Sequence, residues 1–308
     1  MELKCEMQVR FHVSAFRFPF NSMVHEFQIR VQPHEAANEQ SLKRYIAREK
    51  GMDERTITAV RVLRRSIDAR QRIIYMNLTV RVFVNEMPQM DEYVSREYGN
   101  VEGKQPVIVV GAGPAGLFAA LKLIENGIRP IVVERGRDVR ARKLDLAQIS
   151  RTHKVNPESN YCFGEGGAGT YSDGKLKVGS KNTAKQKILD EFILAGATPD
   201  ISYSATAHLG TDKLGQIVKN IRKKIVDNGG SFIFGAKFTE FLYSNDTLSA
   251  VKYIKDGVEN ILPCTDAILA IGHSARDTIS ALYSSGFQMI PKGFGIGMRI
   301  EHPREYIN

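Results

Sequence analysis

The chain has 308 residues, of which 43% are hydrophobic and 25% are charged. This composition is typical of a folded globular protein and argues against a disordered one, while the length leaves room for two domains. The longest uncharged stretch, residues 105–121, is shorter than the roughly 20 apolar residues of a membrane-spanning helix and is interrupted by glycine and proline, so we expect no membrane span.

The formal net charge of +9 is spread along the chain without a long basic block. This distribution favours a solvated basic surface over a surface for anionic small molecules, and nucleic acid is the least favoured partner. Several of the first ten residues are charged, which does not fit a secretory signal. The cysteines are scattered and none forms a C-x-x-C pair: Cys5, Cys162 and Cys264. We therefore expect a cytoplasmic protein.

The N-terminal part alternates between strand-like and helical patterns. Its predicted elements, in chain order, are a strand at 24–31, a helix at 34–49 ended by Gly51, and strands at 57–67 and 72–84. These elements predict a small α+β domain over residues 1–95. Residues 88–104 are polar and irregular, so we expect the domain boundary there.

From residue 105 onward the pattern changes to strands that alternate with helices. The predicted elements, in chain order, are a strand at 107–110, a helix at 114–126, a strand at 131–133, a helix at 211–228 and strand-like runs at 231–235, 250–254 and 267–271. Such alternation is typical of an open parallel sheet covered by helices. The fold class is therefore predicted to be α/β, with a Rossmann-type three-layer domain over residues 105–308.

A glycine motif follows the first of these strands directly. Residues 111–116 read GAGPAG, which has the spacing G-x-G-x-x-G. Gly111 allows the tight turn out of the strand, Gly113 lets the backbone approach a pyrophosphate, and Gly116 allows the helix to pack closely on the strand. The N–H groups of the following helix would then face the phosphates, and Gly127 is well placed to end that helix.

An acidic residue, Glu134, ends the next predicted strand. A carboxylate at this position can accept hydrogen bonds from both ribose hydroxyls of an adenosine and disfavours a 2′-phosphate. Strand, glycine turn, helix and carboxylate in this order predict a dinucleotide site, although they do not distinguish FAD from NAD. Close packing alone remains the alternative explanation for the glycines.

A second glycine-rich segment, YCFGEGGAGTYSDGKL, covers residues 161–176. Its glycines would allow the backbone to lie close to a cofactor, and its polar side chains would add hydrogen-bonding groups. A surface loop without a ligand is the alternative. Asp173 and Lys175 in this segment could form an ion pair that stabilises the loop.

Taken with HLGTDKL and AILAIGHSARDT, these motifs make the sequence resemble the uncharacterised FAD-dependent dehydrogenases of bacteria, within the glutathione-reductase-like flavoproteins. The resemblance extends over nearly the whole chain, including RRSIDAR near residue 67. Members of that family continue well past GFGIGMRIEHP, so the resemblance implies that this chain is truncated and that its FAD/NAD(P)-binding domain is incomplete at the C-terminus.

The resemblance implies FAD as cofactor, with NAD(P)H as a further co-substrate. The residues that it assigns to cofactor binding are Gly111, Ala112, Gly113, Pro114, Ala115, Gly116, Glu134, Arg135, Gly136, Gly166, Gly167, Ala168, Gly169, Thr170, Lys237, Phe238, Ala270, Gly272 and His273. Lys237 and Phe238 match the position whose backbone meets the adenine. Ala270 to Gly272 replaces the Ala-Thr-Gly signature of such flavoproteins.

No catalytic triad is expected, because the hydride passes through the flavin itself. His273 is the candidate for a catalytic role, with a structural histidine as the alternative. Cys162 is expected to pack inertly because no second cysteine has redox spacing. No metal site is expected. The predicted function is an FAD-dependent oxidoreductase; the alternatives are an NAD(P)-dependent dehydrogenase without flavin and a non-catalytic, RNA-associated flavoprotein. No motif identifies the substrate or the oligomeric state.

Overall fold

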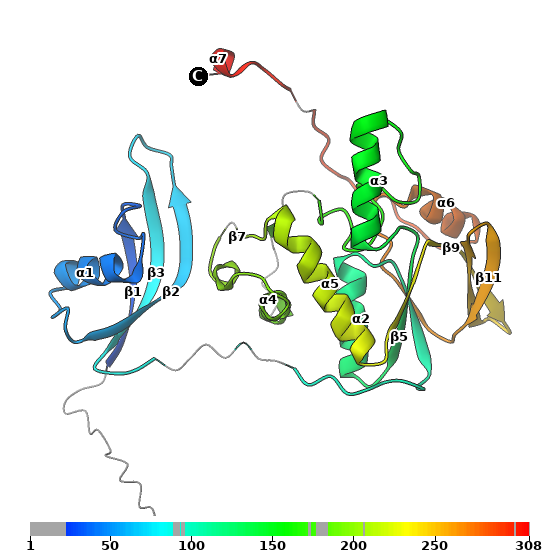
Figure 1. The fold of residues 1–308 in the computed structure, drawn as a ribbon, viewed down its shortest axis with the longest axis horizontal. Coiled ribbons are helices and arrows are strands. Elements are labelled where there is room, and N and C mark those ends of the chain that lie inside the picture. Colours follow the sequence, from blue (N-terminus) through cyan, green and yellow to red (C-terminus); the bar gives the residue numbers. More distant parts are fainter. Residues whose placement is uncertain are drawn as a thin grey trace, which may run out of the picture. The chain divides into compact units, whose positions relative to one another are not determined.

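The computed structural model describes residues 23–88, 93, 96–171, 174–176, 184–205, 207–298 and 300–307 (Figure 1). Contacts within the chain group its residues into two compact units. One consists of the chain up to Ser95 together with Ser172–Ile217, and the other of Arg96–Tyr171 together with Val218–Asn308. The predicted domain bounds, 1–95 and 105–308, differ from this grouping in where they place Ser172–Ile217, and they stay a prediction.

The first unit contains a three-stranded antiparallel sheet of order β1-β3-β2 and a helix. The elements are β1 (Met23–Val31), α1 (Glu39–Lys50), β2 (Ile57–Asp68) and β3 (Tyr75–Val84). The alternating apolar residues of the strands pack with the buried face of α1 into one core, which includes Ile29, Ile46, Ile57 and Val80. Helix α1 begins later than predicted because the Asn38 side chain accepts a hydrogen bond from the N–H of Ser41, whereas Gly51 ends the helix at φ 63° as predicted.

Further elements of this unit follow later in the chain. They are β6 (Lys175–Leu176), α4 (Ala184–Leu194), the 3₁₀ helix η1 (Pro199–Ser202) and β7 (Ala207–His208), and the N-terminal part of α5 (Thr211–Asp227) also belongs here. β6 pairs with β7. The segment after η1 extends the edge of β2, because the N–H of Arg65 donates to the carbonyl of Tyr203 at 2.9 Å and the N–H of Ala205 donates to the carbonyl of Arg65 at 2.9 Å.

The second unit is built on a parallel sheet of order β12-β4-β5-β8. Its strands are β4 (Pro106–Val110), β5 (Arg129–Glu134), β8 (Ser231–Phe234) and β12 (Ala267–Leu269). Val107–Val110 and Ile131–Val133 are adjacent and parallel as predicted, with Ile108 opposite Ile131 and Val110 opposite Val133. The run predicted at 267–271 is shorter as a strand and ends at Leu269.

Helix α2 (Pro114–Glu125) contacts β4 and β5, while a three-stranded antiparallel sheet shares a core with the parallel sheet. That second sheet consists of β9 (Ala236–Ser244), β10 (Thr247–Lys255) and β11 (Val258–Pro263). The remaining helices are α3 (Val139–Thr152), α6 (Arg276–Ser284) and α7 (Arg304–Ile307). Helix α2 ends as predicted: Gly127 has φ 72° and its N–H donates to the carbonyl of Ile124.

The chain is therefore of mixed α/β architecture. Because β4, β5 and β12 are parallel, their carboxyl ends lie at the same edge of the sheet, and ligands of open α/β sheets bind at that edge. Within the part of the chain that the structure describes, no helix is both long and apolar enough to span a bilayer.

Candidate functional site

The glycine turn after β4 has the tight geometry that its sequence predicts. Gly111 has φ +107°, and a Cβ atom there would lie 2.4 Å from the carbonyl oxygen of Ala270. A Cβ atom on Gly116 would lie 1.8 Å from the carbonyl oxygen of Gly111. Both positions therefore exclude a side chain for reasons of packing within the protein itself.

Gly113 differs from these two glycines, because a Cβ atom there would come no closer than 3.8 Å to another atom, the Cα of Gly167. It is also the N-cap residue of α2 and supplies no side-chain cap to the first turn. The open space beside Gly113 and the uncapped N–H groups of the helix are thus available to a ligand.

The second glycine segment packs directly on this turn. The N–H of Gly166 donates to the carbonyl of Ala112 at 2.8 Å. A Cβ atom on Gly167 would lie 3.1 Å from the Cδ of Pro114 and 3.2 Å from the Cα of Gly113. The two glycine-rich segments, which are far apart in the sequence, therefore form neighbouring parts of one site.

Glu134 joins three segments of this site. Its side chain is 5% exposed, Oε2 accepts a hydrogen bond from the N–H of Ala112 at 2.7 Å, and Oε1 accepts hydrogen bonds from Gly136 at 2.8 Å and Gly164 at 3.0 Å. The carboxylate thus holds the first turn, the end of β5 and the second loop together. Among the residues that the structure describes, Oε2 accepts one of these bonds, which leaves it a second lone pair.

Exchanging Glu134 for glutamine is expected to lower both stability and dinucleotide affinity. An amide has one acceptor oxygen, so its NH₂ group would face at least one backbone N–H that now donates to the carboxylate. The expected loss of stability is about 1.5–3 kcal/mol, the scale of a hydrogen bond to a charged group. Urea denaturation and ADP titration would measure the two effects. Glu102→Gln, at an exposed position, is the control, and equal stability of the two variants would contradict this role of Glu134.

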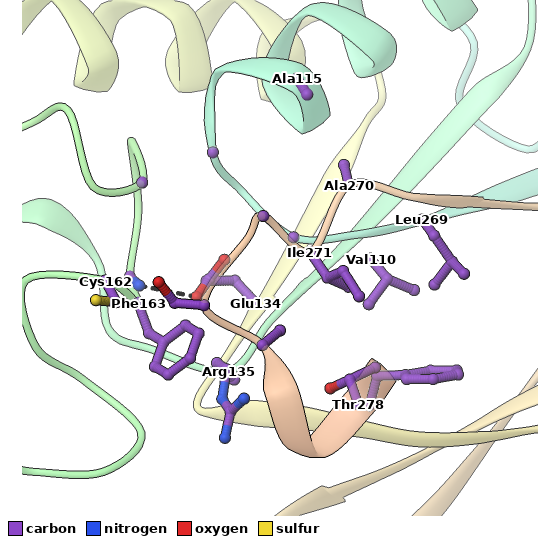
Figure 2. Close-up of a pocket in the computed structure, with 18 of the residues that line it drawn as sticks. Val110, Ala115, Glu134, Arg135, Cys162, Phe163, Leu269, Ala270, Ile271 and Thr278 are labelled. Atoms are coloured by element: carbon purple, nitrogen blue, oxygen red, sulfur yellow. Dashed lines mark hydrogen bonds between the residues drawn. The ribbon is translucent and has the colours of Figure 1, made fainter. Parts of the chain in front are cut away.

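These elements surround a pocket with a volume of about 460 Å³ at the carboxyl edge of the sheet (Figure 2). The predicted site residues that line it are Gly111, Gly113, Pro114, Ala115, Glu134, Arg135, Gly167, Ala168, Lys237, Phe238, Ala270, Gly272 and His273. Figure 2 shows Ala270 and Ile271 on one side of Glu134, and Cys162 and Phe163 on the other.

Several predicted site residues do not line the pocket: Ala112, Gly116, Gly136, Gly166, Gly169 and Thr170. Most of them support its walls instead. A Cβ atom on Gly136 would lie 2.5 Å from the backbone of Gly164, and the hydroxyl of the fully buried Thr170 donates to the carbonyl of Glu165 at 3.4 Å. Gly116, Gly136 and Gly166 thus permit close packing within the protein, whereas a Cβ atom on Gly169 would meet nothing within 4 Å.

Charged residues form a network beside the pocket that sequence reasoning did not include. Arg135 donates to both carboxylate oxygens of Asp277 at 2.9 Å and from Nε to Glu158 at 2.8 Å, and the Nζ of Lys237 lies 2.8 Å from Asp277. The guanidinium of Arg135 also stacks 4.1 Å from the ring centroid of Phe163. Each of the two cations at the pocket is therefore paired with carboxylates.

The hydrogen bonds from Arg135, and then that from Lys237, hold the pKa of Asp277 well below its usual value of 3.8. Stability from this network is consequently present above about pH 4 and is lost as the pH falls toward the lowered pKa. Asp277→Asn should cost roughly 0.5–1 kcal/mol at pH 7, because the pair is partly exposed, and the difference from the wild type should shrink at low pH.

Urea denaturation of the wild type and Asp277→Asn between pH 3 and pH 7 measures this effect. Asp256→Asn, an exposed position, is the control. A difference between wild type and Asp277→Asn that grows as the pH falls would contradict the assignment.

A second feature that sequence reasoning missed is Glu165, which is fully buried. Its Oε2 accepts a hydrogen bond from the N–H of Val139 at 2.8 Å, and its Oε1 lies 3.1 Å from the Nε of Arg222. Burial raises the pKa of this carboxyl group, while the Val139 hydrogen bond and the Arg222 charge oppose that shift. Glu165 thus ties the second loop to the start of α3.

The other candidate side chains lie as follows. His273 is exposed and lines the pocket. The expectation that Cys162 is packed is wrong, because this residue is exposed at the pocket wall, whereas Cys264 is buried. The proposed pair of Asp173 with Lys175 involves Asp173, which lies outside the described residues. Among the residues that are described, no three His, Cys, Asp or Glu side chains gather as metal ligands.

Family models match two parts of the chain. One, described as an FAD binding domain, matches residues 104–159, and another, a domain of unknown function, matches residues 23–83. An uncharacterised protein of Clostridium beijerinckii is 40% identical over 282 residues, which cover 87% of this chain and 52% of that protein. The chain therefore spans about half the length of this relative.

Solved structures resemble the chain only distantly. A structure of Thermovibrio ammonificans THI4 is 17% identical, with a TM-score of 0.39, over 59% of this chain and 63% of that chain. The 3-ketosteroid dehydrogenase of Rhodococcus jostii is 13% identical, with a TM-score of 0.33, over 56% of this chain and 48% of that chain.

Proposed function

We propose that the pocket binds FAD in a Rossmann-type domain and that the protein is an FAD-dependent oxidoreductase. The observation that carries the proposal is the meeting of the two glycine segments and Glu134 around one pocket at the carboxyl edge of the sheet. The match to an FAD binding domain includes the turn, α2 and Glu134, which supports FAD over NAD as the cofactor.

The residues present fit a pyrophosphate and an adenosine ribose. The space beside Gly113 would accept phosphate oxygens next to the uncapped first turn of α2, where the helix dipole favours an anion. The free lone pair on Oε2 of Glu134 would accept a ribose hydroxyl. Because Arg135 and Lys237 are already paired with Asp277 and Glu158, neither cation is available to a 2′-phosphate.

FAD, when bound, supplies the hydride chemistry, and the residues of this chain position it and exclude water. His273 lies at the pocket and is the proposed side chain for proton transfer to or from a substrate. For the whole protein we further propose that NAD(P)H is the hydride donor, that the substrate is a small molecule and that the protein is cytoplasmic.

Titration of the purified chain with FAD, ADP and NAD⁺ tests this function. We expect the flavin fluorescence of FAD to change when it binds, FAD to raise the thermal midpoint of the protein, and ADP to compete with FAD for the site. Tight binding of NAD⁺ without binding of FAD would replace the proposal by a nicotinamide-dependent dehydrogenase. Binding of neither, with salt-dependent retention of RNA on a filter, would favour the RNA-associated alternative.

A further inference from the structure

Arg142 is a buried arginine on α3. The loop that forms one wall of the pocket surrounds its side chain. Its side chain is fully buried, and its guanidinium donates hydrogen bonds to five backbone carbonyls of residues 160–167. The acceptors are Asn160 at 2.9 Å, Tyr161 at 3.1 Å, Gly164 at 3.3 Å, Glu165 at 2.9 Å and Gly167 at 2.8 Å.

The carbonyls take the place that a carboxylate usually has beside a buried cation. Within the described part of the chain, Arg142 forms no ion pair, and a buried charge is tolerated only where its hydrogen-bonding groups are satisfied. The guanidinium is planar and offers its donors in a fixed fork, so it restricts the directions from which the carbonyls can approach. The conformation of the loop is therefore coupled to the presence of this one side chain.

The same loop lines the pocket with Phe163, Gly164 and Gly167, and the next residue, Ala168, lines it as well. Two N–H groups of the loop have partners other than Arg142. The N–H of Gly164 donates to the carboxylate of Glu134, and the N–H of Gly166 donates to the carbonyl of Ala112. The N–H of Ala168 donates no hydrogen bond within the residues that the structure describes. A wall whose carbonyls are held by a cation presents less negative charge to phosphate oxygens than a wall with free carbonyls.

We propose that Arg142 is a positioning residue for dinucleotide binding: it holds the carbonyls of the loop at residues 160–167 away from the pocket, so that this wall accepts the phosphates. The inference rests on the proposed function of the pocket. Arg142 does not line the pocket, so it acts through the loop rather than by contact with the ligand.

Arg142→Met tests the proposal, because methionine keeps an unbranched apolar stem and removes every donor. Calorimetric titration with ADP should show a loss of about tenfold to hundredfold in affinity, by analogy with the effect of residues that orient the ligands of a bound metal ion. Arg140→Met is the matched control, two residues away on the same helix and exposed, and it should bind ADP as the wild type does. Arg142→Lys should be intermediate, since an ammonium cannot reach all five carbonyls.

Hydrogen exchange provides a readout that a general loss of stability would not give. Without ligand, the amides of Gly164 and Gly166 should exchange faster in Arg142→Met, whereas those of Val109 and Val132 in the sheet should stay protected. Gly164→Ala disturbs the same contact from the side of the loop. Gly164 has φ +120°, and a Cβ atom there would lie 2.4 Å from the Cδ of Arg142, so this variant should also weaken ADP binding.

The outcomes separate this inference from the proposed function. A wild type that binds neither ADP nor FAD contradicts the proposed function. A wild type that binds ADP, with Arg142→Met binding equally well, contradicts only the role of Arg142. Uniformly faster exchange, or failure of Arg142→Met, Arg142→Lys and Gly164→Ala to fold, would also contradict it, because Arg142 would then be a requirement of the fold and not of the loop.

Discussion

Replacing Gly116 by alanine is expected to destabilise the protein by about 3 kcal/mol, at the upper end of the range for overpacked sites. The new Cβ would lie 1.8 Å from the carbonyl oxygen of Gly111, and this neighbour is backbone that cannot rotate away as a side chain could. Accommodation would require α2 to move away from β4. The helix buries Leu117, Ala120 and Leu121, so such a movement would also expose apolar surface.

Urea denaturation of Gly116→Ala and of Gly99→Ala measures this effect, since a Cβ atom on Gly99 would meet nothing within 4 Å. We expect the midpoint of Gly99→Ala to stay near that of the wild type. A Gly116→Ala variant as stable as the wild type would mean that the close approach of helix and turn does not exist in solution.

Replacing Gly113 by valine is expected to abolish dinucleotide binding while the fold persists. Its backbone, at φ −71° and ψ −179°, is accessible to any L-residue, and its nearest neighbour to a Cβ is 3.8 Å away. The branched side chain would instead fill the space beside the first turn of α2, where the phosphates are proposed to lie. We expect a stability change within about 1 kcal/mol, the usual cost of a poor N-cap residue.

Calorimetric titration of ADP and FAD into Gly113→Val and Gly113→Ala measures the loss. The alanine variant should bind more weakly than the wild type and more tightly than the valine variant, because the overlap with the ligand grows with side-chain size. Unchanged ADP affinity in a folded Gly113→Val protein would show that the dinucleotide binds elsewhere. Comparison of Gly113→Val with Gly116→Ala therefore distinguishes a glycine needed for ligand binding, Gly113, from a glycine needed for stability, Gly116.

The sequence by itself determined the segment from β4 to Glu134. Every feature there is local: a β-branched strand, a glycine-rich turn in which Gly111 needs positive φ, an apolar helix and a carboxylate at the next strand end. Local signals of this kind depend on neighbouring residues, so their consequences can be derived without knowing the rest of the fold. The strands of the first unit and the end of α1 at Gly51 could be predicted from the sequence for the same reason.

Only the tertiary structure decided how distant polar groups meet at the site. Arg142 lies in VRARKLDLAQISRT, where nothing in the spacing distinguishes it from the exposed Arg140, yet five carbonyls of a loop about twenty residues away surround it. Carbonyl acceptors are present at every residue, so they leave no pattern in the sequence. The pairing of Arg135 with Asp277 and the exposure of Cys162 likewise depend on where the loop and α6 settle against the sheet, which is set by long-range packing rather than by local preference.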